Sequence, residues 1–358
     1  MKRSAAALLR STGVLAATRT LMRQRSLILT YHGVLSEGGN QDAFLNHNFI
    51  SADVFDRQMR WVREHYRPVS LATLVDCYRN RQQPPARAVA VTFDDGFANN
   101  YSVAFPILRR HAIPFTIFLT TGLIDTPGAQ LWTERVKRSI YMHDGRTARL
   151  SLLGREFVLD LGSLDARAAA ARAVLQFLKQ QSASARDGAV LAVESALGCP
   201  PLGAADRERY AFLTWAQVRE MADAGVEFGS HTVSHPILST LDSVEVEREV
   251  KESQERIAAE LKRPCQLFAY PNGSAADFTD RDKQALRNAG YEAAFSLRGR
   301  LNGPRPDLFE IDRVNVGRQL DPVLFEAAAV GMLGLARRAR QRVVEARRGP
   351  ALATARAR

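Results

Sequence analysis

The chain has 358 residues, of which 46% are hydrophobic and 24% are charged, a composition typical of a folded globular protein and not of a disordered or fibrous one. Its formal net charge of +11 would suit a nucleic-acid-binding protein, but the excess lies at the two ends of the chain. Residues 1–36 carry six basic side chains and no acid, and residues 331–358 carry eight arginines and one glutamate. Because the ends contribute +6 and +7, the segment 37–330 is about −2 by difference, which argues against a nucleic-acid partner.

The two basic ends have two open interpretations, which are contact with an anionic membrane surface and solvated tails. We interpret residues 1–26 as a basic segment with an amphipathic helix over 4–25, because Arg10 interrupts its apolar run before it reaches the length of a secretory signal. Residues 321–358 are predicted to be a C-terminal helix and basic tail. Within them, Val323–Ala336 is apolar and too short to span a membrane; it suits either a membrane interface or packing on the main domain.

The three cysteines, Cys77, Cys199 and Cys265, are widely spaced and form no C-x-x-C pair. This pattern indicates neither a disulfide framework nor a thiolate zinc site.

Residues 27–320 alternate predicted strands with predicted helices. Apolar runs over 27–31, 88–93 and 115–119 predict strands, and a helix-like stretch over 98–111 joins the last two. The pattern continues with a helix at 214–224 capped by Thr214, strand 226–229, helix 243–261, strand 266–270, helix 279–289 and strand 293–296. Repeated strand-helix-strand units imply parallel strands, and their number favours a distorted (β/α) barrel, an α/β fold, over an open doubly wound sheet.

One segment, about 127–212, interrupts this alternation. It contains an alanine-rich, helix-prone stretch over Leu164–Leu197, flanked by glycine and proline clusters. We interpret it as a helical insertion between barrel units. Whether it forms a lid over a substrate site or a surface excursion without a chemical role stays open at this level.

Two adjacent carboxylates, Asp94 and Asp95, follow the strand 88–93 and precede Gly96. Neighbouring strand residues point to opposite faces, so both acids reach one site only if the chain turns there, and glycine permits such a turn. An ordinary surface turn has a similar composition, so the pair alone does not establish a site.

Two histidines, His231 and His235, follow the strand 226–229. Residues four apart share one face if the segment is helical, and this spacing suits a single divalent ion. Solvated loop histidines are the alternative. A strand-end carboxylate would complete a three-ligand set with open positions for water and substrate. Because an open metal site polarises a carbonyl and lowers the pKa of water, this combination favours hydrolysis.

These motifs resemble those of the polysaccharide deacetylases, carbohydrate esterase family four, whose members share the NodB homology domain. Residues 92–96 (Thr-Phe-Asp-Asp-Gly) resemble the first motif of that family, and residues 231–235 (His-Thr-Val-Ser-His) resemble the second. The resemblance covers roughly residues 27–320, less clearly in the segment 127–212. It implies that Asp95, His231 and His235 bind the metal and that Asp94 is the general base that activates the attacking water.

Residues 268–273 (Phe-Ala-Tyr-Pro-Asn-Gly) resemble the third motif of the family, which lines the substrate groove. The resemblance makes Tyr270, Pro271 and Asn272 candidates for contact with substrate, with a backbone amide near Asn272 stabilising the oxyanion. A local Pro-Asn-Gly turn explains the same residues without excluding that role.

The sequence departs from the family pattern in two places. The arginine that usually begins the third motif is absent, and the nearest substitute, Arg313, either orients and tunes Asp94 or forms an ordinary ion pair. No histidine follows His235, so the late catalytic histidine of the family is also absent. In the branch of the exopolysaccharide and poly-N-acetylglucosamine deacetylases, an early histidine lies in the site, which here corresponds to His32.

We therefore predict that His32 donates a proton to the departing amine, with capping of its strand as the alternative. The remaining histidines are expected to be ordinary surface or packing residues, and they are His47, His65, His111 and His143.

The expected function is hydrolytic removal of N-acetyl groups from N-acetylhexosamine units of a bacterial polysaccharide, oligosaccharide or glycolipid. The expected cofactor is one divalent ion, Zn²⁺ first, with Co²⁺, Ni²⁺ and Fe²⁺ also compatible with two histidines and one aspartate. The alternatives are a sugar O-acetyl esterase and a non-catalytic glycan-binding module on the same fold. We expect the protein to be cytoplasmic or peripheral at the membrane, and less readily secreted.

Overall fold

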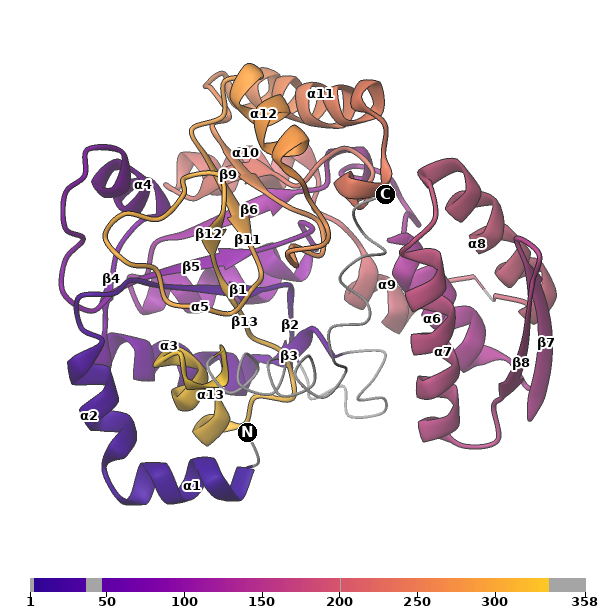
Figure 1. Ribbon diagram of the computed structural model, residues 1–358, viewed down its shortest axis with the longest axis horizontal. Coiled ribbons are helices and arrows are strands. Elements are labelled where there is room, and N and C mark those ends of the chain that lie inside the picture. Colours follow the sequence, from indigo (N-terminus) through magenta and orange to yellow (C-terminus); the bar gives the residue numbers. More distant parts are fainter. Residues whose placement is uncertain (1–2, 37–46, 200, 335–358) are drawn as a thin grey trace, which may run out of the picture.

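A sheet of short, buried, parallel strands forms the centre of the protein, and helices surround it (Figure 1). The computed structural model describes residues 3–36, 47–199 and 201–334. The strands pair in the order β12-β11-β10-β9-β6-β5-β1-β13, with β4 beside β5. Their bounds are β1 Leu27–Tyr31, β4 Arg67–Pro68, β5 Ala88–Phe93, β6 Phe115–Leu119, β9 Glu227–Ser230, β10 Leu267–Ala269, β11 Ala293–Ser296, β12 Ile311–Asp312 and β13 Val314–Asn315.

The first and last strands of this order are consecutive in the chain, because Arg313 alone separates β12 from β13. Ser296 of β11 pairs with Asp312, and Leu29 of β1 pairs with Val314, both in parallel. One short stretch therefore joins the two edges of the sheet and nearly closes it into a barrel. The predicted (β/α) barrel is confirmed, and closure leaves few strand edges unpaired.

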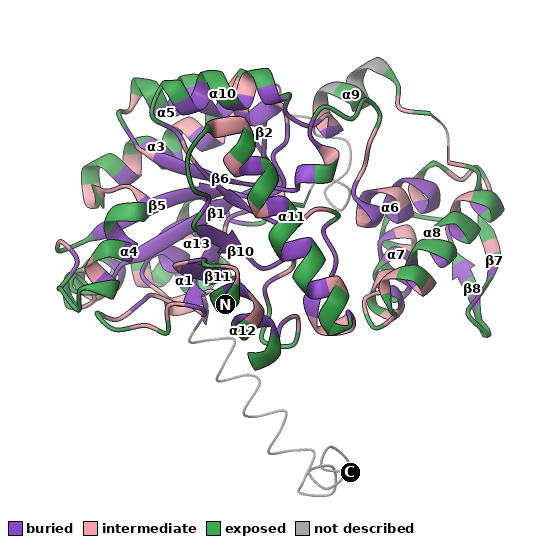
Figure 2. Ribbon diagram, turned by 90° about the horizontal axis from the view of Figure 1, so that it is seen from above, coloured by how far each residue is buried: buried purple, intermediate pink, exposed green. Residues whose placement is uncertain are grey.

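Successive residues of a barrel strand face two different layers, as the two-residue period of a strand requires. In β5, Val89, Val91 and Phe93 belong to the large apolar cluster that includes the surrounding helices. Ala88 and Ala90 belong to a second cluster of residues from several strands. Figure 2 shows the buried strands enclosed by helices whose outer faces are exposed.

The helices around the barrel form where the sequence supplies an apolar stripe and a cap. Thr214 begins α10 with a capping box, since its side chain accepts a hydrogen bond from Gln217 N, and such a cap contributes about 1 kcal/mol. The bounds of these helices are α3 Ala52–His65, α4 Leu71–Arg79, α5 Phe105–Arg110, α10 Trp215–Asp223, α11 Ser243–Leu261 and α12 Asp280–Asn288. The helices and strands predicted between 214 and 296 are thus present, with ends within about two residues.

The segment 127–212 forms a subdomain beside the barrel (Figure 1). The predicted helix-prone stretch is split into two helices, and a β-hairpin that we did not predict precedes them. Alternate hairpin residues are buried and join the helices in a separate apolar cluster. The elements are α6 Trp132–Met142, β7 Thr147–Leu152, β8 Arg155–Asp160, α7 Leu164–Leu178, α8 Ala183–Leu197 and α9 Ala204–Tyr210.

The N-terminal segment contains two helices, α1 Arg3–Ser11 and α2 Val14–Leu21, so the prediction of one helix over 4–25 is wrong. The helix is interrupted at Gly13, whose φ of 75° lies in the left-handed region that glycine adopts readily. Both helices pack on the C-terminal helix α13, Pro322–Ala329.

The contacts of α13 decide how its apolar residues are used. Ala327 and Val330 pack against Ala6 and Leu15, and Phe325 joins the main core. The described part of Val323–Ala336 therefore contains a helix that packs on the main domain and on the N-terminal helices, which supports the second of its two interpretations. Residues 335–336 and the basic tail lie outside the described residues, and contact of the basic ends with an anionic membrane stays a prediction. No helix among the described residues is long and apolar enough to cross a bilayer.

Candidate active site

A pocket of about 630 Å³ lies at the carboxyl ends of the barrel strands, where loops of (β/α) barrels carry functional groups. Part of its lining lies at or just beyond the ends of barrel strands, and these residues are His32, Asp94, Asp95, His231, Asn272, Leu297 and Asn315. Two of the residues predicted from the sequence, His32 and Asn272, are 240 positions apart in the chain and are thus brought to one place.

The two adjacent aspartates reach the pocket because the chain turns sharply after β5. Asp94 is completely buried, and Asp95 has a φ of 73° followed by 85° at Gly96. The φ of Gly96 lies in the left-handed region that glycine adopts readily, and a Cβ there would lie 2.8 Å from the Leu119 Cδ2 methyl group. The turn expected at Gly96 therefore begins at Asp95, a non-glycine residue in a costly conformation of the kind that accumulates at functional sites.

The segment that carries His231 and His235 is a loop and not a helix, which corrects the helical geometry considered for this motif. Thr232 and His235 have positive φ values of 70° and 61°. Glu249, buried on α11, accepts hydrogen bonds from Val233 N at 2.8 Å and Ser234 N at 2.9 Å. The histidines therefore owe their positions to a carboxylate that satisfies the backbone of their loop.

Sequence reasoning missed Glu249, although it left a signal. On α11 the buried positions include Val246, Glu249, Val250, Ser253 and Ile257, so an acid occupies the apolar face of an amphipathic helix. A carboxylate at such a position requires buried donors, which indicates a structural or functional partner.

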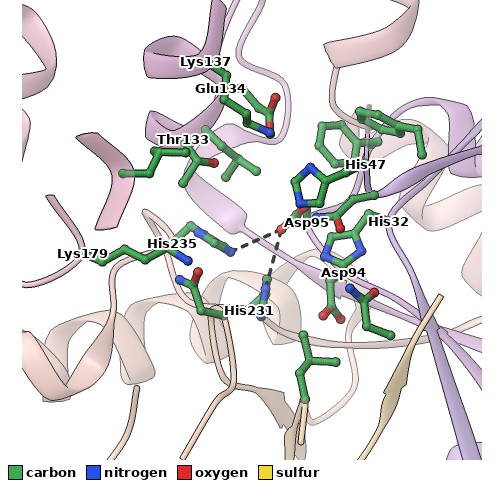
Figure 3. Close-up of a pocket in the computed structure, with 18 of the residues that line it drawn as sticks. His32, His47, Asp94, Asp95, Thr133, Glu134, Lys137, Lys179, His231 and His235 are labelled. Carbon is green, nitrogen blue, oxygen red and sulfur yellow. Dashed lines mark hydrogen bonds and ion pairs between the residues drawn. The ribbon is translucent and has the colours of Figure 1, made fainter. Parts of the chain in front are cut away.

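Three acceptor atoms converge in the centre of the pocket (Figure 3). Asp95 Oδ1 lies 3.6 Å from His231 Nε2 and 3.4 Å from His235 Nε2. His231 Nδ1 lies 2.7 Å from Ala269 O, which assigns the proton to Nδ1 and leaves the Nε2 lone pair facing Asp95.

The pKa values leave the two imidazoles neutral, as metal ligands must be, and indicate that the anionic form of Asp95 lacks a compensating positive charge. Burial lowers the pKa of His231 and, together with the neighbouring His231 and His32, holds the pKa of His235 well below its usual value. Burial and the negative charges of Asp94 and Glu134 raise the pKa of Asp95 well above its usual value. Asp95 Oδ1 is buried without a hydrogen-bond partner among the described residues. Facing lone pairs repel unless a cation lies between them, so the three residues fit one divalent ion.

Arg313 holds the other aspartate through two hydrogen bonds. Its Nη1 and Nη2 donate to the two carboxylate oxygens of Asp94 at 2.7 and 2.8 Å, and the arginine is completely buried. Burial alone would raise the pKa of Asp94, but the guanidinium, together with the neighbouring His231 and His32, more than offsets it, so the pKa is lowered and the carboxylate is anionic. Of the two interpretations of Arg313, the structure therefore supports direct orientation and tuning of Asp94.

His32 lies in the pocket directly after β1, and 8% of its surface is exposed. Asn100 Nδ2 donates to its carbonyl oxygen at 2.7 Å, whereas its Nδ1 has no hydrogen-bond partner among the described residues. Burial lowers the pKa of His32 to about 4. The imidazole is thus neutral at pH 7, and any acid role requires it to take up a proton during the reaction.

Of the third-motif residues, only Asn272 lines the pocket. The Tyr270 ring stacks on Phe278 at 4.0 Å and its hydroxyl donates to Phe309 O. Its side chain, directly after the end of β10, is completely buried in the core and does not line the pocket, so the contact with substrate predicted for this residue is wrong for the side chain. Pro271 is buried outside the pocket lining, while Asn272 has a φ of 60° and turns into the pocket.

Two groups of pocket residues were not predicted. His47, expected to be an ordinary histidine, lines the pocket, whereas His65, His111 and His143 bind neighbouring groups elsewhere, as expected. The segment 127–212 also forms one wall and is more than a surface excursion. It contributes Leu131, Thr133, Glu134, Lys137, Arg172, Leu175, Gln176 and Lys179.

Comparison with known proteins places this geometry in a family context. Residues 81–143 and 165–294 match the family model described as polysaccharide deacetylase. The poly-beta-1,6-N-acetyl-D-glucosamine N-deacetylase of Escherichia coli K12 is 32% identical over 100 residues, 28% of this chain and 14% of that protein. The enzyme of the same name from Staphylococcus aureus MSSA476 is 33% identical over 75 residues, 20% of this chain and 25% of that protein. The match thus spans a quarter or less of these two relatives.

Solved structures support the fold. The deacetylase PplD of Streptococcus pyogenes, in complex with acetate, superposes with a TM-score of 0.57 at 19% identity, covering 85% of this chain and 98% of that chain. IcaB from Ammonifex degensii superposes with a TM-score of 0.53 at 20% identity, covering 86% and 97%.

Proposed function

Because the chain belongs to the polysaccharide deacetylase family, whose model matches more than half of its residues, we propose that it hydrolyses N-acetyl groups from N-acetylhexosamine units. The substrate would be a bacterial polysaccharide, oligosaccharide or glycolipid. The observation that carries this proposal is one pocket in which three metal-type ligands lie beside an arginine-held aspartate. Membership of a family of carbohydrate hydrolases indicates the reaction class, and these side chains provide the metal ligands and the base that such a hydrolysis needs.

Asp95, His231 and His235 would hold the metal. When bound, a divalent ion supplies Lewis acidity, which polarises the acetamide carbonyl and lowers the pKa of water. Zn²⁺ is our first choice, and Co²⁺, Ni²⁺ and Fe²⁺ also suit two imidazoles and one carboxylate. The hydrogen bond from His231 Nδ1 to Ala269 O keeps this ligand oriented before the metal arrives.

Asp94 would act as the general base. Arg313 keeps its carboxylate anionic and fixed, while the remaining lone pairs can accept a proton from water as the water oxygen bonds to the acetyl carbon. The backbone amide near Asn272 would donate to the oxygen that becomes negative. The proton that Asp94 accepts from water would be passed on to His32, and His32 would donate it to the nitrogen as the C–N bond breaks, which releases acetate and a free amine.

Two alternatives differ in what they require of this site. A sugar O-acetyl esterase would use the same residues, but its alcohol leaving group depends less on protonation. A non-catalytic glycan-binding module would not need the base, yet Asp94 and the three candidate ligands are all present and converge. The complete set favours an enzyme over a binding module.

The deciding experiment measures acetate release by the zinc-loaded protein from a panel of N-acetylated and O-acetylated oligosaccharides. Asp94→Asn should keep its fold and metal, at a lower stability because the buried charge of Arg313 loses its partner, and should lose about 10²–10⁴-fold in rate, the usual size of general-base catalysis. Asp76→Asn, which changes an exposed aspartate on α4, is the matched control and should be unaffected. Release from no N-acetylated sugar, or normal release by Asp94→Asn, would refute the proposal.

A further inference from the structure

One face of α7 forms a continuous stripe along the pocket. The pocket-lining residues of this helix region are Arg172, Leu175, Gln176 and Lys179, which follow one another at intervals of three, one and three. That spacing places them on one side of a helix. The adjacent side, with Ala171, Val174 and Leu178, packs into the apolar cluster of the 127–212 subdomain, and Leu175 also contacts this cluster. The subdomain therefore holds this stripe rigidly against the catalytic pocket.

Lys179, at the carboxyl end of the stripe, points into the pocket (Figure 3). The side chain is half-buried, and burial lowers its pKa. The carboxylate of Asp277 partly opposes this lowering, and the positive charge of Lys137 adds to it. Among the residues that the structure describes, Lys179 is still not part of an ion pair, and removing an ammonium group partly from water without a paired carboxylate costs free energy. The position therefore suits an anion that binds there.

The carboxylates of the pocket are committed to other partners. Glu134 pairs with Lys137 on α6, and Asp94 pairs with Arg313. Asp95 belongs to the candidate metal site. No carboxylate of the pocket lining is left to neutralise Lys179.

The rest of the stripe suits a sugar chain that carries the anion. Arg172, which already interacts with another group of the protein, adds a second positive charge two helical turns away, about 10 Å along the axis. Leu175 and Gln176 lie between the two cations and offer an apolar surface and an amide, the combination that sugar rings require. The stripe therefore provides charge at both ends and ring contacts in the middle.

We propose that the α7 stripe binds a carboxylate or phosphate group of the glycan, so that the protein acts on an acidic glycan in preference to a neutral one. This inference rests on the proposed deacetylase function for the identity of the sugar chain. The anion-binding role of Lys179 is separate from catalysis, since no step of the hydrolysis uses it.

The test compares three forms of one oligosaccharide, which are hexa-N-acetylchitohexaose, the same chain oxidised at C6 to carboxylates, and the same chain phosphorylated at C6. Dissociation constants are measured by calorimetry with the zinc-loaded Asp94→Asn protein, which should not turn the probes over. At low salt, at least one acidic form should bind about ten- to a hundredfold more tightly than the neutral form, the size of one charge-assisted hydrogen bond. The stronger of the two acidic forms identifies the anion as carboxylate or phosphate.

Substitutions then assign the preference to the stripe. Lys179→Gln should abolish it while binding of the neutral chain changes less than about twofold, and Lys179→Arg should retain most of it. Lys251→Gln, which removes an exposed lysine of α11 outside the pocket, is the matched control and should change nothing. Equal binding of acidic and neutral chains, or the same loss for both in Lys179→Gln, would overturn the inference.

Binding and turnover separate this inference from the proposed function. If wild-type protein releases no acetate while the charge preference and its loss in Lys179→Gln persist, the anion site stands and the deacetylase proposal fails. If acetate is released equally well from acidic and neutral chains, and binding shows no preference, the anion site fails and the deacetylase proposal stands.

Discussion

Substitution of Arg313 by glutamine tests the tuning of Asp94 most directly. The wild-type guanidinium is completely buried and donates two hydrogen bonds of 2.7 and 2.8 Å to a carboxylate that is also completely buried. Glutamine can replace one of these bonds but not the positive charge. The variant therefore leaves a buried carboxylate without its counter-ion.

The expected loss of stability is about 3–5 kcal/mol at pH 7, the usual cost of removing one partner of a buried ion pair. Arg79, which is paired with Glu292 at 2.7 Å but lies partly exposed, provides the control. Because exposed ion pairs contribute only about 0–1 kcal/mol, Arg79→Gln should cost no more than that.

The pH dependence gives the sign of the effect. In the wild type the pKa of Asp94 is lowered, so the stabilisation by this pair is present above the unfolded pKa of about 3.9 and is lost as the pH falls through the folded pKa. Without Arg313, the largest influence that opposes burial is gone and burial should raise the pKa of Asp94, so the variant should lose stability as the pH rises above about 4. The difference between the free energies of unfolding of the wild type and of Arg313→Gln should therefore become smaller from pH 7 toward pH 4.

Urea unfolding of both proteins between pH 4 and 8 measures this difference in the free energy of unfolding. The acidic limb of the rate profile should also move to higher pH in the variant, because the base must be ionised to act. A free energy of unfolding within about 1 kcal/mol of the wild type at pH 7, or a difference that does not depend on pH, would refute the role assigned to Arg313.

Three other predictions concern the metal, the loop that carries its ligands and the proton donor. Purified protein should hold about one divalent ion per chain by elemental analysis, and His231→Ala and His235→Ala should each lose most of this metal. Full retention of the metal in both variants would refute the proposed metal site. Glu249→Gln weakens the acceptor that fixes the histidine loop and should lower metal affinity about 10–100-fold, whereas Glu252→Gln, exposed on the same helix, should not. His32→Ala should lose about 10²-fold or more with an amide substrate but much less with an activated aryl acetate, whose leaving group needs no proton; equal losses would leave the acid unassigned.

The best sequence predictions concern features that a few neighbouring residues decide. The strands 88–93 and 115–119 and the helix 243–261 have the predicted bounds, because apolar runs and capping residues act within one element. The motif at 231–235 shows the limit of such reasoning. Its spacing suits a helix, yet hydrogen bonds to Glu249 from another element hold it as a loop.

The partnership of Asp94 and Arg313 depends on the whole barrel. The two residues are 219 positions apart, and they meet because the stretch around Arg313 closes the sheet between β11 and β1. The family resemblance nominated Arg313 only as a replacement for a missing arginine. Nothing in the sequence around Arg313 distinguishes a buried arginine that donates two hydrogen bonds to a carboxylate from a surface ion pair, since both use the same residue types.

The sequence by itself determined the strand and helix pattern, the chemical character of Asp94, Asp95, His231 and His235, and hence the reaction class, because ligand type and local periodicity are properties of short segments. Tertiary structure alone decided which acids are tuned, which loop residues turn inward and which wall the 127–212 subdomain contributes. The physical reason is that a pKa, a ligand distance and a pocket wall depend on groups brought together through space, and closure of the barrel brings them together.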